Sequence, residues 1–275
     1  MNNKSSLNQS IIIGVLSGVL ALALGVAAFV YFKSKNQPQP IVQEKAVKES
    51  KALQLPSNEA ALKELFGMSD PSGKVKTAPY ELVSFWFEKS FKVGTDNVNA
   101  KFFAIQKLDE SGQPIESHAT GVEIGVITYK QNSDQWMVVS KQQKFGMVAS
   151  WGTVDGVKPE VLQLSPESLA VMLNSSDGMG GTNFEGSAIF VFSKNSWHDV
   201  GSIETGGDNS GTMDDKQYSY KGVISVVAGS ESDYPNLLVT RTGTEMDKEE
   251  VIPAKNVTYI FKDGKYINPK AVSQE

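Results

Sequence analysis

The sequence contains no cysteine and only two histidines, and these two scarcities remove whole classes of chemistry. Without cysteine the chain can form no disulfide, no thiol nucleophile and no thiolate metal site. Two histidines do not supply a histidine-rich metal centre within one chain. The G-x-S-x-G pattern of α/β-hydrolase nucleophiles is absent as well. The sequence therefore displays no assembled catalytic constellation.

An excess of positive charge is also lacking. The chain has 26 basic and 31 acidic residues, a net charge of −5. Nucleic-acid binding depends on a basic face, so this balance argues against a nucleic-acid partner.

The two histidines, His118 and His198, do not by themselves indicate catalysis. His118 precedes a predicted strand in SHATGVEIGV, with no carboxylate or nucleophile that the sequence places beside it. His198 is followed by Asp199, but adjacent residues of a strand point to opposite faces. Both are interpreted as structural or exposed.

One long apolar run stands near the start of the chain. Residues 11–32 carry no charge, and they follow a short N-terminal tail at residues 1–10. A helix of this length spans about 33 Å, enough for a hydrocarbon core of about 30 Å. Tyr31 suits the interface, and Lys33 and Lys35 end the run. The pattern predicts a transmembrane anchor in contact with membrane lipid.

A cleaved signal peptide is the alternative for this segment, because residues 21–23 and 26–28 place small residues where a signal peptidase requires them. The orientation has arguments on both sides. Five lysines follow the segment and favour a cytoplasmic C-terminus, but long domains translocate largely regardless of charge. The segment also begins ten residues from the start, as an uncleaved export signal does. An exported domain is therefore the preferred interpretation.

The apolar run contains two rows of small residues. Gly14 and Gly18 form a G-x-x-x-G pair, and Ser17, Ala21 and Gly25 form a second row. Either row would let two helices approach closely and form a homodimer. The alternative is that glycine and alanine are simply common in such helices.

Residues 33–56 are polar and interrupted by prolines, which predicts a linker. Residues 57–98 are expected to form a helical or mixed lead-in. Within it, Ser57–Gly67 has a polar N-cap, an apolar stripe and a terminating glycine, so it predicts a short helix. The cluster at Tyr80–Phe91 fits a helix face or a strand equally well.

Residues 99–275 are expected to form a β-rich domain. Runs rich in β-branched and aromatic residues alternate with clusters of Gly, Asn, Asp and Ser. This pattern predicts an antiparallel all-β domain, either a sandwich or a twisted meander, with a propeller-like arrangement as a third option. Hairpins are predicted at Ser187–Ile203 and Val257–Ile267.

The loop at residues 206–215, GGDNSGTMDD, is the most suggestive candidate for an ion site. Calcium binds six to eight oxygen atoms from flexible loops, and oxygen-bearing side chains alternate here. The spacing does not match an EF-hand loop. The alternative is a solvated turn rich in Asp, Asn and Gly. The candidate calcium ligands are Asp208, Ser210, Thr212, Asp214 and Asp215.

The glycine-rich segment at residues 174–186, NSSDGMGGTNFEG, lacks the lysine and the following helix of a phosphate-binding loop. A wide loop or a bulged hairpin is expected, with a partner-binding loop as the functional alternative.

Four stretches together resemble a group of uncharacterised bacterial envelope proteins that have an exported all-β domain. They are HATGVEIGVITYK from His118, the QWMVVSKQ that follows, the DGMGG loop and the DNSG near Asp208. The resemblance covers roughly residues 102–244 and implies bacterial origin and an exported location. Relatives often carry a cysteine beside the histidine, whereas Ser117 and Thr120 stand there in this chain. The group brings no activity that could be carried over.

These observations together favour a single-pass protein of the bacterial inner membrane with a periplasmic C-terminal domain. It would act as a binding or structural module, with a protein partner in the envelope. One alternative is a hydrolase whose site lies around His118 or the Asp208 loop. Another is an inhibitor, or a sensor of a small ligand or calcium. A cleft that held His118 with a carboxylate would favour the enzyme, and an apolar patch on a sheet would favour the binding module.

Overall fold

The computed structural model describes residues 53–117, 119–149, 151–228, 232–247 and 249–269. The chain divides into two units, Met1–Ala52 and Leu53–Glu275. The first unit lies outside the described residues, and so do the expected tail, anchor and most of the linker. In the part that is described, no helix is long and apolar enough to cross a membrane.

The short helix expected at the start of the second unit is confirmed. Helix α2 (Asn58–Phe66) begins after Ser57, whose side chain accepts a hydrogen bond from the backbone N–H of Ala60 at 3.1 Å. It ends at Gly67, which adopts a left-handed conformation with φ of 75°. The helix buries the apolar stripe predicted for it against the first sheet; the buried residues are Ala61, Leu62 and Leu65.

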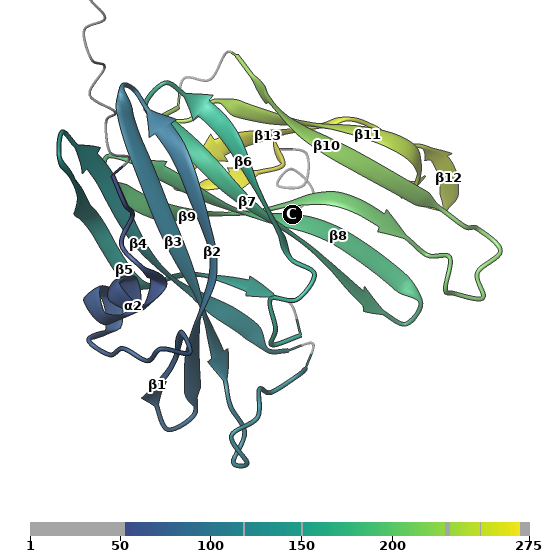
Figure 1. Cartoon of the computed structure of the whole chain (residues 1–275). Helices are drawn as coiled ribbons and strands as arrows, with labels where there is room; N and C mark the ends of the chain where they lie inside the picture. The colour runs from purple at the N-terminus through teal and green to yellow at the C-terminus, as the bar shows by residue number, and fades with distance from the viewer. Residues whose placement is uncertain (1–52, 118, 150, 229–231, 248, 270–275) are drawn as a thin grey trace, which may run out of the picture. The chain divides into compact units, whose positions relative to one another are not determined.

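The first sheet has five antiparallel strands in sequence order (Figure 1). They are β1 (Lys74–Ala78), β2 (Glu81–Val93), β3 (Asp96–Lys107), β4 (Gly121–Asn132) and β5 (Gln135–Ala149). The ambiguous cluster at Tyr80–Phe91 thus belongs to strand β2, because pairing with β3 along its whole length decides the period. The sheet begins at Lys74, and the expected boundary between residues 98 and 99 falls inside β3.

The second sheet has nine strands and curves into a half-barrel. The order is β14-β13-β11-β10-β9-β8-β7-β6, with β12 paired to β11 (Figure 1). The strands are β6 (Lys158–Ser165), β7 (Ser168–Met179), β8 (Thr182–Ser193), β9 (Ser196–Asp208), β10 (Ser219–Val227), β11 (Asn236–Asp247), β12 (Glu250–Pro253), β13 (Val257–Lys262) and β14 (Lys265–Ile267).

The antiparallel all-β class is confirmed, and so are both predicted hairpins. Strands β8 and β9 pair up to Ser193 and Ser196, and β13 and β14 pair up to Lys262 and Lys265. The two sheets share one apolar core, so they stack face to face. The propeller-like alternative therefore does not describe these residues.

The first half of β7 and the second half of β8, which pair with each other, are buried on both faces. On β7, Leu169, Val171 and Leu173 pack against the first sheet, whereas Ala170 and Met172 face the interior of the half-barrel. Strand β8 alternates in the same way. Because successive side chains of a strand point to opposite faces, a strand buried on both sides reads as a continuous apolar run. This explains the runs SLAVML and SAIFVF.

The glycine-rich segment at residues 174–186 is not a wide loop. Strands β7 and β8 stay paired without a register shift until Met179 and Thr182, where Gly180 and Gly181 form the turn. Both glycines have positive φ, 63° and 85°, which is the conformation that two-residue hairpin turns require. The expectation of a wide loop was wrong, because the turn needs only two residues of that stretch. The expected hairpin is present, and its second strand has a register shift against β9 between Glu185 and Gly186.

Candidate binding cleft in the half-barrel

The half-barrel is open on one side because β10 separates from β9. These two strands pair only where Ser219–Lys221 meets Gly206–Asp208, whereas β10 pairs with β11 over its entire length. Among the described residues, the segment Gly222–Val227 of β10 therefore has a paired strand on one side only. Strand β6 is the other free edge at this opening.

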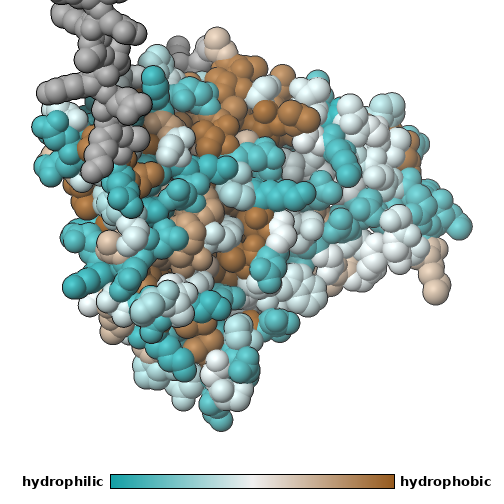
Figure 2. Space-filling view, viewed as in Figure 1, coloured by the Kyte–Doolittle hydropathy of each residue, from teal (hydrophilic) through white to brown (hydrophobic). Residues whose placement is uncertain are grey.

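A cleft of about 380 Å³ lies at this opening. Three consecutive residues of β10, Gly222, Val223 and Ile224, form one wall. Strands β6 to β9 form the rest, where the apolar interior of the half-barrel gives way to polar side chains. The surface over β8 and β12 is largely teal and white in Figure 2, so it is mainly hydrophilic. The principal polar lining residues are Lys158, Glu160, Asn174, Ser176, Glu185, Ser187 and Thr205.

Three charged side chains of the cleft are available to a ligand. Lys158 and Glu160 on β6 are exposed and Glu185 on β8 is half-buried. Within the described part of the chain, none of the three makes a hydrogen bond or an ion pair. By contrast, Ser187 is buried and its hydroxyl donates to the side-chain oxygen of Asn174 at 2.6 Å.

The register of the strands spreads these charges along the cleft. Glu160 stands opposite Met172 of β7, Lys158 stands opposite Asn174, and Glu185 stands opposite Ser176. The three charged residues thus lie in three rows across the sheet, and successive rows are two residues apart along β7. Each step along β7 corresponds to about 6.6 Å. The cleft presents charge in an elongated array.

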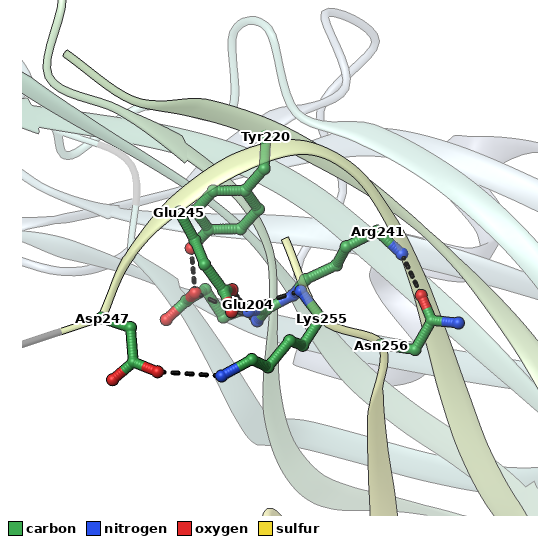
Figure 3. A network of polar contacts seen from close by, with 7 residues as sticks. All are labelled: Glu204, Tyr220, Arg241, Glu245, Asp247, Lys255 and Asn256. Atoms are coloured by element: carbon green, nitrogen blue, oxygen red, sulfur yellow. Dashed lines mark hydrogen bonds and ion pairs between the residues drawn. The ribbon is translucent and has the colours of Figure 1, made fainter. Parts of the chain in front are cut away.

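A network of polar contacts ties β10 and β11 back to β9, and so holds the wall of the cleft in place (Figure 3). The Tyr220 hydroxyl donates to the carboxylate of Glu204. The guanidinium of Arg241 donates to Glu204 and to Glu245, at 3.1 Å each, and its carbon lies 4.7 Å from the centre of the Tyr220 ring. The Arg241 side chain is only 9% exposed. Two carboxylates and an aromatic face thus compensate its charge.

The network continues into the connection between β12 and β13. Glu245 accepts a hydrogen bond from the backbone N–H of Lys255 at 3.2 Å, and Asn256 accepts one from the backbone N–H of Arg241 at 2.9 Å. Burial, and then the hydrogen bond to Glu204, raise the pKa of Tyr220. The Nε atom of Arg241 is buried without a hydrogen-bond partner in the described structure. Because both ends of the guanidinium are occupied, we interpret the network as structural support for the cleft.

The candidate calcium ligands lie where β9 ends and the following loop begins. The backbone N–H and the hydroxyl of Ser210 both donate to one oxygen of Asp208, and the hydroxyl bond measures 2.7 Å. These bonds lower the pKa of Asp208, with the hydroxyl contributing most. The two side chains thus form a turn.

The other three candidate ligands make local bonds or point outward. Thr212 donates to the backbone carbonyl of Asn209 at 2.9 Å, and Asp214 accepts from the backbone N–H of Lys216 at 3.1 Å. Asp215 is exposed. Over the described residues, no group of three or more His, Cys, Asp or Glu side chains is arranged to hold a metal ion. Asp208 and Ser210 are brought together directly, and the Thr212 hydroxyl accepts a hydrogen bond from the backbone N–H of Asp214 at 3.3 Å, but these local bonds do not join the five side chains into one site.

Of the two histidines, only His198 belongs to the described residues. His118 lies outside the described residues. His198 is exposed on β9, and the carboxylate of its neighbour Asp199 accepts a hydrogen bond from the backbone N–H of Gly201 at 2.9 Å.

Sequence reasoning did not identify the cleft or the network, although two signals were present. Arg241 is the only arginine among 26 basic residues, and its fork of donors meets two carboxylates. The run SLAVML changes to NSSD while the strand continues, which marks the point where a buried strand meets an open cleft. Comparison with protein-family models, with curated proteins and with solved structures finds no match for this chain.

Proposed function

We propose that the chain is a binding module of the bacterial envelope that holds an elongated polar ligand in the cleft of its half-barrel. The observation that carries this proposal is the set of three charged side chains, Lys158, Glu160 and Glu185, which face one cleft without partners in the described structure. Hydroxyl and amide groups beside them supply further hydrogen bonds. Ligand sites usually have a volume of several hundred Å³ and use a few convergent polar groups to orient the ligand.

The spacing of the two glutamates favours binding over hydrolysis. Their positions opposite Met172 and Ser176 are four residues apart along β7, about 13 Å in an extended strand. Carboxyl pairs that act together in glycoside hydrolysis are about 5–9.5 Å apart. Glu160 and Glu185 therefore fit two contacts along one ligand better than an acid and a base at one bond.

The proposal includes a location in the bacterial envelope. The charge-free run at residues 11–32 and the resemblance to exported envelope proteins support a single-pass anchor in the inner membrane, with the β domain in the periplasm. A reporter enzyme that is active only after export, fused behind Glu275, should be active. Activity of a reporter that works only in the cytoplasm would overturn this location.

A photo-crosslinking amino acid at Ser176 tests the cleft as a binding site. Ser176 is exposed and lines the cleft, so the substitution should leave the fold intact. In living cells we expect a discrete adduct that depends on ultraviolet light. The matched control is the same amino acid at Gln163, which is also exposed on this sheet but does not line the cleft. Equal labelling at both positions, or none at Ser176, would refute the proposal.

A further inference from the structure

Among the described residues, the segment Gly222–Val227 of β10 has a paired strand on one side only and lacks the usual protection of an edge, although β6 packs close to part of β10. Free edges are normally shielded by charges, prolines, bulges or short length, because unpaired backbone groups recruit other strands. This segment reads GVISVV, with no charge and no proline, and its pairing with β11 has no register shift. Val223 is 72% exposed.

The other long free edges of the described structure carry such protection. Strand β6 contains Pro159 together with Lys158 and Glu160. The register of β5 with β4 shifts twice, which marks bulges. The unprotected edge of β10 is thus an exception, and it borders the cleft.

The charges of the cleft repeat at the spacing of an extended peptide. Glu160, Lys158 and Glu185 occupy three successive rows, each about 6.6 Å from the next. An extended chain that runs along the strands turns every second side chain to the same face, with the same period. Each inward side chain of such a peptide would reach a new row. A compact ligand would reach only one or two of them.

We propose that the occupant of the cleft is an extended peptide that adds as a strand to the Gly222–Val227 edge of β10. The inference rests on the proposed function and narrows it to one ligand class. The peptide's main chain pairs with the free backbone groups of β10, which is a common mode of peptide recognition. Its inward side chains enter the cleft, with a basic residue opposite Glu185, the half-buried carboxylate without a partner in the described structure. Its outward side chains cover Val223.

The probe is a fluorescent octapeptide of alternating lysine and valine, and the protein is the full-length chain in detergent micelles. Fluorescence anisotropy should show saturable binding. A peptide methylated on alternate backbone nitrogens, which cannot complete a strand pairing, should bind at least about tenfold more weakly. A peptide with glutamate in place of lysine should also bind more weakly, because its carboxylates face two glutamates, Glu160 and Glu185, and only one lysine, Lys158.

Val223→Lys tests the edge directly, since a charge there protects an edge against pairing. It should weaken binding of the lysine–valine peptide about tenfold without changing the thermal midpoint. Val138→Lys is the matched control, because Val138 is an exposed valine on a different edge strand, β5. It should leave the affinity unchanged. Glu185→Gln should weaken the lysine peptide and improve the glutamate peptide.

Several results would overturn strand addition. One is equal affinity of the methylated and unmethylated peptides, and another is indifference to Val223→Lys. A third is absence of saturable peptide binding; if Ser176 nevertheless crosslinks in cells, the cleft has a ligand of another class and the proposed function stands. Absence of both peptide binding and crosslinking at Ser176 would refute both strand addition and the proposed function. If Val223→Lys instead converted a dimer into a monomer, the occupant would be a second copy of this chain.

Discussion

Arg241 can remain nearly buried because its charge is balanced at both ends of the guanidinium. Glu204 and Glu245 each accept from it, and the Tyr220 ring covers its face. Removing such a cation leaves carboxylates that repel each other in a partly desolvated site. The residue thus joins β9 to β11 in a way that neither strand achieves by backbone pairing.

Arg241→Met keeps much of the side-chain volume and removes the charge. We expect it to lower the free energy of unfolding by about 2–3 kcal/mol, less than the loss of a fully buried pair because Glu204 is half-exposed. Denaturation followed by tryptophan fluorescence measures this. Lys255→Met is the control, because its ion pair with Asp247 is on the surface, and it should leave the midpoint nearly unchanged. Equal effects of the two variants would contradict the role of the network.

Tyr220 should make the fold sensitive to alkaline pH. Its folded pKa is raised by burial and by Glu204, whereas the unfolded value is about 10. The folded state thus retains a proton that the unfolded state loses, and the stabilisation, complete below about pH 10, declines as pH rises further. Tyr220→Phe should show a shallower decline between about pH 10 and 11. Tyr266 and Tyr259 also have raised pKa values, so part of the decline should persist. Parallel curves for the two proteins would contradict this assignment.

At the level of elements, the hairpin of β7 and β8 is fixed at its tip by a close backbone contact. The N–H of Gly211 donates to the carbonyl of Gly181 at 3.0 Å, and a Cβ on Gly181 would lie 2.3 Å from the carbonyl oxygen of Gly211. Gly180 has no atom within 4 Å of the equivalent position. Of these two glycines, only Gly181 packs against the loop after β9.

Alanine substitution at the two turn glycines should separate strain from contact. Both have positive φ, so each variant should lose about 1 kcal/mol through backbone strain. Gly181→Ala should lose roughly 1–3 kcal/mol more, because the loop must move away. Urea denaturation of both variants measures the difference. Equal losses would show that the contact with Gly211 contributes nothing.

The loop after β9 should behave as an acidic turn toward calcium. Its oxygens already accept or donate turn hydrogen bonds at Asp208, Ser210, Thr212 and Asp214. A bound ion at a hundred times its dissociation constant would add about 2.7 kcal/mol of stability. We expect melting curves in millimolar calcium and in chelator to coincide. An upward shift that Asp208→Ala combined with Asp214→Ala abolishes would establish a site instead.

Local signals in the sequence were enough for some elements and not for others. Helix α2 was predictable because Ser57 and Gly67 act on their immediate neighbours. Strand β2 was not, since its apolar residues suit either period and only the pairing with β3 decides. The cleft as a whole could not be predicted from the sequence for a similar reason. Glu160, Glu185 and Val223 come from three strands, and their meeting depends on where β10 leaves β9.

At the scale of the whole molecule, the proposed anchor at residues 11–32 can be tested by mutation. Replacing Leu22 and Leu24 with arginine should detach the protein from membranes, because each costs about 2.5–3.5 kcal/mol at the centre of an inserted helix. Membrane fractionation with an antibody to the C-terminal unit measures this. The same changes at Gln37 and Gln39, outside the apolar run, are the control. A mature N-terminus at Leu24 or Phe29 would instead identify a cleaved signal peptide.

The hairpin of β7 and β8 supplies one wall to each of two apolar cores, one on either face. Unfolding of the hairpin in either core would therefore also uncover the other core. The β-rich unit should accordingly lose its structure in a single calorimetric transition, with no state in which one sheet survives alone. The first five strands are synthesised before the hairpin. Their inner face is therefore covered only after the hairpin has folded. A chaperone that binds the emerging chain could bind this exposed apolar face.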